Sequence, residues 1–170
     1  RVVHPQDRSL FESEVKLLIK LGEMDAAVAV LRKQIEQEPT NVNLVFSLGT
    51  ILEQAGRPTE ALKAYRQALV IDADHYNSNF NVGAILLNEA SDVVRERNKL
   101  GKSNEELKKT EQLDSRIDQM LKDALPYWEK VNEAKADEKT SLESLRYIYT
   151  QLGMDELAAA TIERLNALEE

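Results

Sequence analysis

Residues 41–74 have the sequence NVNLVFSLGTILEQAGRPTEALKAYRQALVIDAD. Apolar residues recur in this stretch at every third or fourth position, as in Leu44, Leu48 and Leu52, and this spacing indicates helix rather than strand. Gly56-Arg57-Pro58 predicts a turn, because proline is tolerated in the first turn of a helix, where its missing N–H has no partner. The stretch therefore predicts two antiparallel helices joined by a tight turn.

The same pattern recurs along the chain with a period of 34 residues. Residues of one type are separated by this distance in the pairs Gly22 and Gly56, Ala27 and Ala61, Gly49 and Gly83, and Pro5 and Pro39. Such a period is the signature of a repeat architecture, in which each helical pair buries its apolar face against the next. Strand-like alternation is not found, so we expect an all-α fold.

These residues resemble the tetratricopeptide repeat. The motif is present as Val45-x-x-Leu48-Gly49-x-x-Leu52 followed by Ala61-x-x-x-Tyr65, with Ala73 in place of the usual proline. The resemblance implies a right-handed superhelix, or α-solenoid, of about four helix-turn-helix repeats. It also implies that helices approach closely at small residues, which here are Gly49, Gly83, Ala27 and Ala61. Tyr65 would fill the space between neighbouring pairs.

The period also sets the predicted boundaries. One domain over 1–170 would hold repeats at about 8–41, 42–75, 76–138 and 139–170, and 1–7 would be a remnant of a preceding repeat. Glu14-Val15 in the first repeat and Arg146 in the fourth depart from the Leu-Gly pattern. Because Leu17, Leu18, Ile19 and Leu21 make the first helix apolar on almost every side, we expect an upstream helix to cover it. In the last helix, Glu163, Asn166 and Glu170 are expected to form a polar outer face, as at a natural terminus.

The third repeat is longer than the others. Gly49 and Ala61 are 12 residues apart, whereas Gly83 and Ala124 are 41 apart, so 29 residues have been added at one turn, around 91–119. We expect both helices to extend into a projecting hairpin, with Gly101 ending the first and Ser103-x-x-Glu106 capping the second. Residues 91–123 have no net charge, because they include eight basic and eight acidic residues. Two interpretations stay open, a solvated helical spacer and a surface for a partner or for self-association.

Composition narrows the classes of function. The 170 residues carry a formal net charge of −8, which disfavours nucleic acid and anionic membranes as partners. The chain has no cysteine, so thiolate metal sites and thiol nucleophiles are excluded. No apolar run suggests a membrane span, although the chain begins at Arg1 without methionine, so a signal peptide could have been removed.

Residues that could support catalysis are scarce. His4 and His75 are the two histidines, and they are too far apart in sequence to suggest a metal site. Trp128 stands in the place of Tyr65 and is interpreted as a packing residue rather than a platform for a ligand. We therefore expect no catalytic residue, no metal and no cofactor.

What remains is a binding surface. In tetratricopeptide proteins the first helices of successive repeats line a groove that holds peptides, and on this register the groove would include Glu12 and Lys16 together with Asn43, Phe46, Thr50, Asn77, Phe80, Ala84 and Tyr147. Phe46 and Phe80 are again 34 residues apart, as are Asn43 and Asn77. The alternative is that the two phenylalanines only pack against a neighbouring helix. The basic clamp that chaperone-binding relatives use for a terminal carboxylate is missing, because Glu12, Asn43, Ser47 and Asn77 occupy its places.

The sequence therefore predicts a non-catalytic scaffold that binds a peptide or protein partner in its concave groove. The alternative is a structural component that self-associates through the long hairpin, so a homo-oligomer stays open. The segments ALPYWEKVNEA and SLESLRYIYTQLGM resemble bacterial tetratricopeptide proteins of the Bacteroidetes type. That resemblance implies a location in the periplasm or cell envelope.

Overall fold

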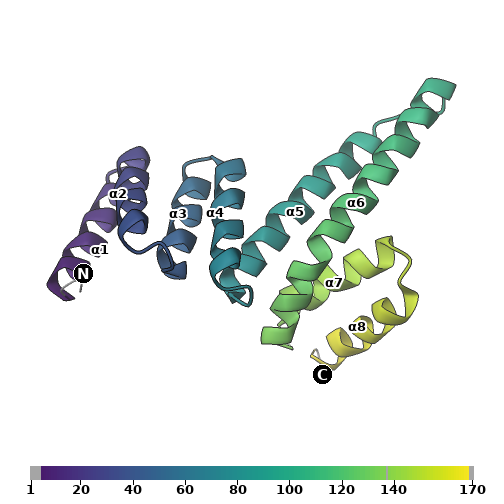
Figure 1. Ribbon diagram of the computed structural model, residues 1–170. Coiled ribbons are helices and arrows are strands. Elements are labelled where there is room, and N and C mark those ends of the chain that lie inside the picture. Colours follow the sequence, from purple (N-terminus) through teal and green to yellow (C-terminus); the bar gives the residue numbers. More distant parts are fainter. Residues whose placement is uncertain (1–4, 137, 169–170) are drawn as a thin grey trace. The chain divides into compact units, whose positions relative to one another are not determined.

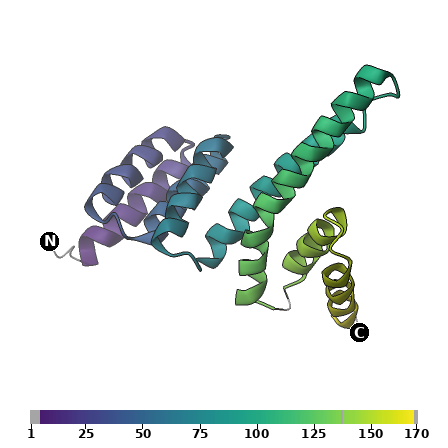
Figure 2. The ribbon, with the colours of Figure 1, turned by 45° about the vertical axis from the view of Figure 1, so that its right-hand side comes forward.

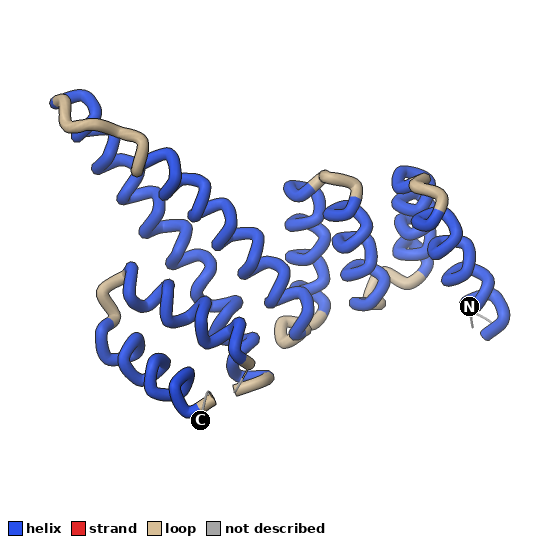
Figure 3. Tube along the Cα trace, turned by 180° about the vertical axis from the view of Figure 1, so that it is seen from behind, coloured by secondary structure: helices blue, strands red, loops and turns tan. Residues whose placement is uncertain are grey.

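The structure is a computed structural model that describes residues 5–136 and 138–168, with side chains from Leu10 onward. The described residues form eight helices and no strand (Figures 1 and 3), so the all-α prediction is confirmed. The helices are α1 (Pro5–Lys20), α2 (Met24–Gln37), α3 (Val42–Gln54), α4 (Pro58–Ile71), α5 (Tyr76–Arg97), α6 (Asn104–Ala134), α7 (Lys139–Gln151) and α8 (Asp155–Ala167).

The chain divides into two compact units. Residues 1–78 form unit 1, with α1 to α4, and residues 79–170 form unit 2, with most of α5 and α6 to α8. Within unit 1, α2 packs on both α1 and α3, and α3 packs on α4; within unit 2, α7 packs on both α6 and α8. The single domain over 1–170 and its repeat boundaries stay predictions.

Local sequence explains where the helices start and stop. Gly22, Gly56 and Gly153 follow the first helix of their repeats and have φ values of +78°, +71° and +67°. Glycine adopts this left-handed conformation at little cost, and it reverses the chain into the next helix. Asn41 and Glu138 begin α3 and α7 by accepting hydrogen bonds from backbone N–H groups of the first turn.

The core of each helical pair combines a small residue with an aromatic ring. A Cβ atom added to Gly49 would lie 2.5 Å from Cε1 of Tyr65, and one added to Gly83 would lie 2.8 Å from Nε1 of Trp128. Tyr65 and Trp128 are fully buried. Trp128 therefore packs in unit 2 as Tyr65 packs in unit 1, and its predicted role as a packing residue is confirmed.

The predicted hairpin is present in unit 2. Helix α5 has 22 residues against 13 in α3, and α6 has 31 against 14 in α4. The two helices run side by side in Figures 1 and 2. Ion pairs join them at Arg97–Asp114 and Glu96–Lys109, with N–O distances of 3.2 and 2.8 Å.

The tip of the hairpin corrects one detail of the prediction. Helix α5 ends at Arg97, before Gly101, and the Gly101 N–H donates to the Glu106 carboxylate instead. The predicted capping box is confirmed, since Ser103 Oγ accepts from the Glu106 N–H and Glu106 accepts from the Ser103 N–H. The Ser103 hydroxyl also donates to the Glu106 carboxylate, at 2.6 Å. This bond and those from the N–H groups of Ser103 and Gly101 hold the pKa of Glu106 below its ordinary value.

Helix α1 keeps an exposed apolar face. Leu10, Leu17 and Leu21 are 70%, 56% and 62% exposed. The residues predicted to end a preceding repeat, 1–7, lie partly outside the described residues, so the remnant stays a prediction. None of the described helices combines the length and the apolar character needed to cross a bilayer.

Candidate functional site

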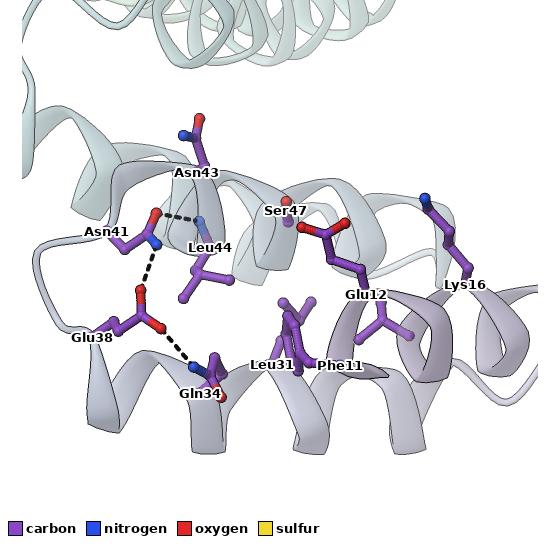
Figure 4. Close-up of a pocket in the computed structure, with 11 residues that line it drawn as sticks. Phe11, Glu12, Lys16, Leu31, Gln34, Glu38, Asn41, Asn43, Leu44 and Ser47 are labelled. Carbon is purple, nitrogen blue, oxygen red and sulfur yellow. Dashed lines mark hydrogen bonds between the residues drawn. The ribbon is translucent and has the colours of Figure 1, made fainter. Parts of the chain in front are cut away.

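A cavity of about 230 Å³ opens between α1, α2 and α3 of unit 1 (Figure 4). Its apolar lining comes from Phe11, Val15, Leu31 and Leu44, and its polar lining from Glu12, Lys16, Gln34, Glu38, Asn41, Asn43 and Ser47. Leu31 and Val15 are 1% and 9% exposed and belong to the packed core of the unit, whereas Phe11 and Leu44 are half-buried. A concave apolar surface bordered by a few polar groups is the usual form of a binding site.

A hydrogen-bond network fixes one wall of the cavity. The Glu38 carboxylate accepts from Nε2 of Gln34 at 2.7 Å and from Nδ2 of Asn41 at 2.8 Å. Asn41 in turn accepts from the Leu44 N–H at the start of α3. Figure 4 shows this chain of contacts between the end of α2 and the start of α3. Because each member is held by another, the wall is ordered before any ligand arrives.

The remaining polar groups of the cavity come from α1 and α3. Glu12 and Lys16 are one turn apart on α1, and Asn43 and Ser47 are one turn apart on α3. Asn43 points away from the network in Figure 4 and is exposed, so its amide can both donate and accept. Lys16 is the one basic side chain of this lining, against the two carboxylates of Glu12 and Glu38.

The other predicted groove residues of unit 1 are not part of the cavity lining. Phe46 is half-buried, and its ring lies 5.5 Å from that of Tyr65 and 5.3 Å from that of His75, measured between centroids. Thr50 donates its hydroxyl to the Phe46 carbonyl. Asn77, near the start of α5, is exposed.

In unit 2 the predicted residues are Phe80, Ala84 and Tyr147, all half-buried. The Phe80 ring packs edge-on against Trp128, with centroids 5.1 Å apart. Both phenylalanines therefore pack against an aromatic residue of the following helix or turn and keep part of their surface exposed. That geometry is compatible with either interpretation of these rings, and the groove assignment of the seven residues stays a prediction.

The contribution of α2 was missed from the sequence, because only the first helix of each repeat was assigned to the groove. Leu31, Gln34 and Glu38 are spaced by three and four residues, so they share one face of α2. That spacing was visible in the sequence. Among the described residues, no group of three or more histidine or acidic side chains is arranged to hold a metal ion.

Comparison with known proteins agrees with this geometry. Residues 18–79 match the family model of the tetratricopeptide repeat. Residues 18–79 therefore belong to the tetratricopeptide-repeat family. This fold generally serves protein interaction rather than catalysis. No curated protein matches the sequence at a significant level.

Solved structures with the same fold are distant in sequence. A MamA RS-1 double mutant is 17% identical with a TM-score of 0.66, and the match covers 94% of this chain and 74% of that one. The first tetratricopeptide domain of Spaghetti (RPAP3), bound to the HSP90 peptide SRMEEVD, is 16% identical with a TM-score of 0.57 over 89% of this chain and 99% of that one. A thermophilic tetratricopeptide protein from Thermus thermophilus is 15% identical with a TM-score of 0.55, over 95% of this chain and 74% of that one. The likeness to Bacteroidetes proteins stays a prediction.

Proposed function

We propose that this tetratricopeptide-repeat protein is a non-catalytic scaffold that binds a peptide segment of a partner protein at the cavity of unit 1. The observation that carries the proposal is the cavity itself, which joins an apolar lining to a pre-ordered polar wall. A peptide would place one apolar side chain against Phe11 and Leu44, and its backbone would exchange hydrogen bonds with the Asn43 amide. Phe46 and Thr50 would extend this surface along α3.

The charges of the cavity indicate what kind of peptide it accepts. Two carboxylates, Glu12 and Glu38, oppose the single ammonium group of Lys16. Spaghetti binds the peptide SRMEEVD, which ends in acidic residues and a carboxylate. A peptide of that kind needs a basic site, and this cavity does not supply one. The expected ligand is a neutral or basic segment with an apolar anchor.

The test begins with selection of random phage-displayed peptides on the purified chain, followed by calorimetric titration of the selected sequences. Ser47→Trp would fill the cavity from α3, and we expect it to weaken binding at least tenfold, a loss of about 1.4 kcal/mol. Ser115→Trp, an exposed serine of the hairpin, is the matched control and should bind as the unmodified chain does. Equal affinity for the Ser47→Trp variant would refute the site.

Two further measurements define the ligand and the extent of the surface. The peptide SRMEEVD should bind with a Kd above about 1 mM. Tight binding of this peptide would contradict the charge argument. Phe46→Ala should weaken peptide binding if that ring belongs to the groove. Unchanged helicity in circular dichroism is required, because the ring also packs against Tyr65.

A further inference from the structure

A second hollow of unit 1, here called the α2–α4 hollow, lies over α3 between α2 and α4 and has a volume of about 380 Å³. Leu48 and Leu52 of α3 and Ala64 of α4 are buried and form its apolar base. Among the described residues, none lines both this hollow and the cavity between α1, α2 and α3. The walls, from α2 and α4, are formed by Arg32, Ile35, Glu36, Glu60, Lys63 and Gln67.

The corresponding place in unit 2 is occupied by a side chain of the unit itself. The motif register relates α2, α3 and α4 to α6, α7 and α8, with a shift of 97 residues. On this register Tyr149 holds the place of Leu52, and Glu129 holds the place of Arg32. The Tyr149 hydroxyl donates to the Glu129 carboxylate at 3.2 Å. The tyrosine therefore reaches from the base to the wall of the space that stays open in unit 1.

A second contact crosses the same place in unit 2. Arg164 of α8 holds the place of Gln67, and Asn132 of α6 holds the place of Ile35. The Arg164 guanidinium donates to Oδ1 of Asn132 at 3.1 Å. In unit 1 the base residue is a leucine, which is smaller than tyrosine, and the isoleucine has no polar group for a partner across the hollow. What unit 1 lacks here is an aromatic ring with a polar group beside it.

The charges on the walls indicate the sign of that polar group. Arg32 approaches the Glu60 carboxylate at 3.4 Å, but Arg57 already holds this carboxylate with two shorter bonds of 2.6 and 2.8 Å. Lys63 is exposed on the facing wall. With Glu60 held by Arg57, the two cations of the lining face one further carboxylate, that of Glu36. The walls therefore favour an acidic group on the ligand.

We propose that the α2–α4 hollow is a second docking site of unit 1, and that it takes an aromatic side chain of a partner protein together with an acidic residue next to it in sequence. The ring lies on Leu52 and Ala64, in the place that corresponds to the ring of Tyr149. The carboxylate lies between Arg32 and Lys63. This site does not rest on the peptide site proposed for the cavity, and the two sites differ in the charge that they accept.

The test uses three synthetic peptides with blocked ends, GSFDDSG, GSFKKSG and GSADDSG. Each is titrated into the full chain, and amide chemical shifts are followed by nuclear magnetic resonance. GSFDDSG should bind with a Kd of about 1 mM or lower, and about tenfold more tightly than either of the other two. The amide shifts that it causes should lie around Arg32, Leu52 and Ala64.

Two double variants test the charges and the space separately. Arg32→Gln with Lys63→Gln should weaken the binding of GSFDDSG about tenfold and remove the difference between GSFDDSG and GSFKKSG. Leu52→Tyr with Arg32→Glu rebuilds in unit 1 the pair that Tyr149 and Glu129 form in unit 2. This variant should close the hollow and abolish the binding of GSFDDSG.

The matched control is Lys108→Gln with Lys122→Gln, two exposed lysines of the hairpin, which changes the net charge equally and should leave all three affinities unchanged. Ser47→Trp, which fills the cavity, should also leave the binding of GSFDDSG unchanged, so failure of one site is distinguishable from failure of the other. No binding of GSFDDSG, equal binding of GSFKKSG, or shifts confined to the cavity would overturn the proposal. Full affinity in either double variant of the hollow would overturn it as well.

Discussion

At the scale of single residues, two glycines decide how closely the helices of a repeat approach each other. Gly49 faces the ring of Tyr65, and Gly83 faces the indole of Trp128. In each case the ring occupies the space where any larger residue would place its Cβ atom. Ordinary carbon contacts are about 3.5–4.0 Å, so the distances found at both glycines leave no room for a methyl group.

Gly49→Ala should therefore destabilise unit 1. The added Cβ would lie 2.5–2.6 Å from two ring atoms of Tyr65, and overpacking of this kind costs about 1–3 kcal/mol. The better helix propensity of alanine offsets up to about 1 kcal/mol of that loss. Urea unfolding followed by circular dichroism measures the difference.

The matched control for this substitution is the double variant Gly49→Ala with Tyr65→Leu, in which the ring is replaced by a smaller side chain. If the clash causes the destabilisation, the alanine should cost less in this background than beside the tyrosine. The same cost in both backgrounds would show that the ring is not responsible.

These residues also show what the sequence could and could not reveal. The period of 34 marked Gly49 and Gly83 as positions of close helix approach and made Trp128 the counterpart of Tyr65. It placed Tyr65 between neighbouring pairs, whereas the ring lies against Gly49 of its own pair. The period could not decide how Phe46 divides its surface between Tyr65, His75 and solvent. That division depends on rotamers and on the turn before α5, which repeat spacing does not encode. Gln34 and Glu38 were missed for a different reason, since the groove was assigned to first helices alone.

At the scale of secondary-structure elements, the sequence predicted the hairpin of α5 and α6, but it did not predict the residue at which α5 ends. The 29 added residues and the capping box at Ser103 were visible in the sequence. Helix α5 ends at Arg97 instead of near Gly101, and the loop before Ser103 is longer than expected. Helix ends fray within a few residues, because the last turn is held by few hydrogen bonds, so composition alone places them poorly.

The start of α6 should be sensitive to acid. Hydrogen bonds from Ser103 and Gly101 stabilise the ionised form of Glu106 and lower its pKa in the folded protein. The stabilisation is fully present above the ordinary pKa of 4.5 and is lost as the pH falls through the lower folded value. Hydrogen exchange by nuclear magnetic resonance should show faster opening of the first turn of α6 in that acidic range.

Glu106→Gln keeps the size of the side chain and removes its charge, so it should make opening of this turn independent of pH over the same range. The first turn of α3, which is capped by the neutral side chain of Asn41, is an internal reference. Equal acid sensitivity of α6 in the Glu106→Gln variant would contradict the role of this carboxylate.

At the scale of the whole molecule, we expect the two units to unfold in separable steps, because each has its own core of a packed glycine and aromatic pair. The single tryptophan, Trp128, lies in unit 2, so its fluorescence reports on that unit alone. Circular dichroism reports on both units. The two signals should give different transitions during urea unfolding.

Substitutions in one unit should separate the steps further. Gly49→Ala should move the part of the dichroism transition that belongs to unit 1 and leave the midpoint of the Trp128 fluorescence unchanged. Gly83→Ala should move the fluorescence midpoint. Coincident transitions in the unmodified chain, with both signals shifted by either substitution, would show one cooperative unit instead.

The contact between Gly83 and Trp128 also limits how this chain can change over evolution. A larger residue at position 83 can be accepted only after the indole has become smaller, and a smaller ring at position 128 leaves a void until position 83 has grown. Either single step passes through a less stable intermediate. The two positions should therefore be inherited as a linked pair, as should Gly49 and Tyr65, and substitutions at one should be accompanied by compensating substitutions at the other.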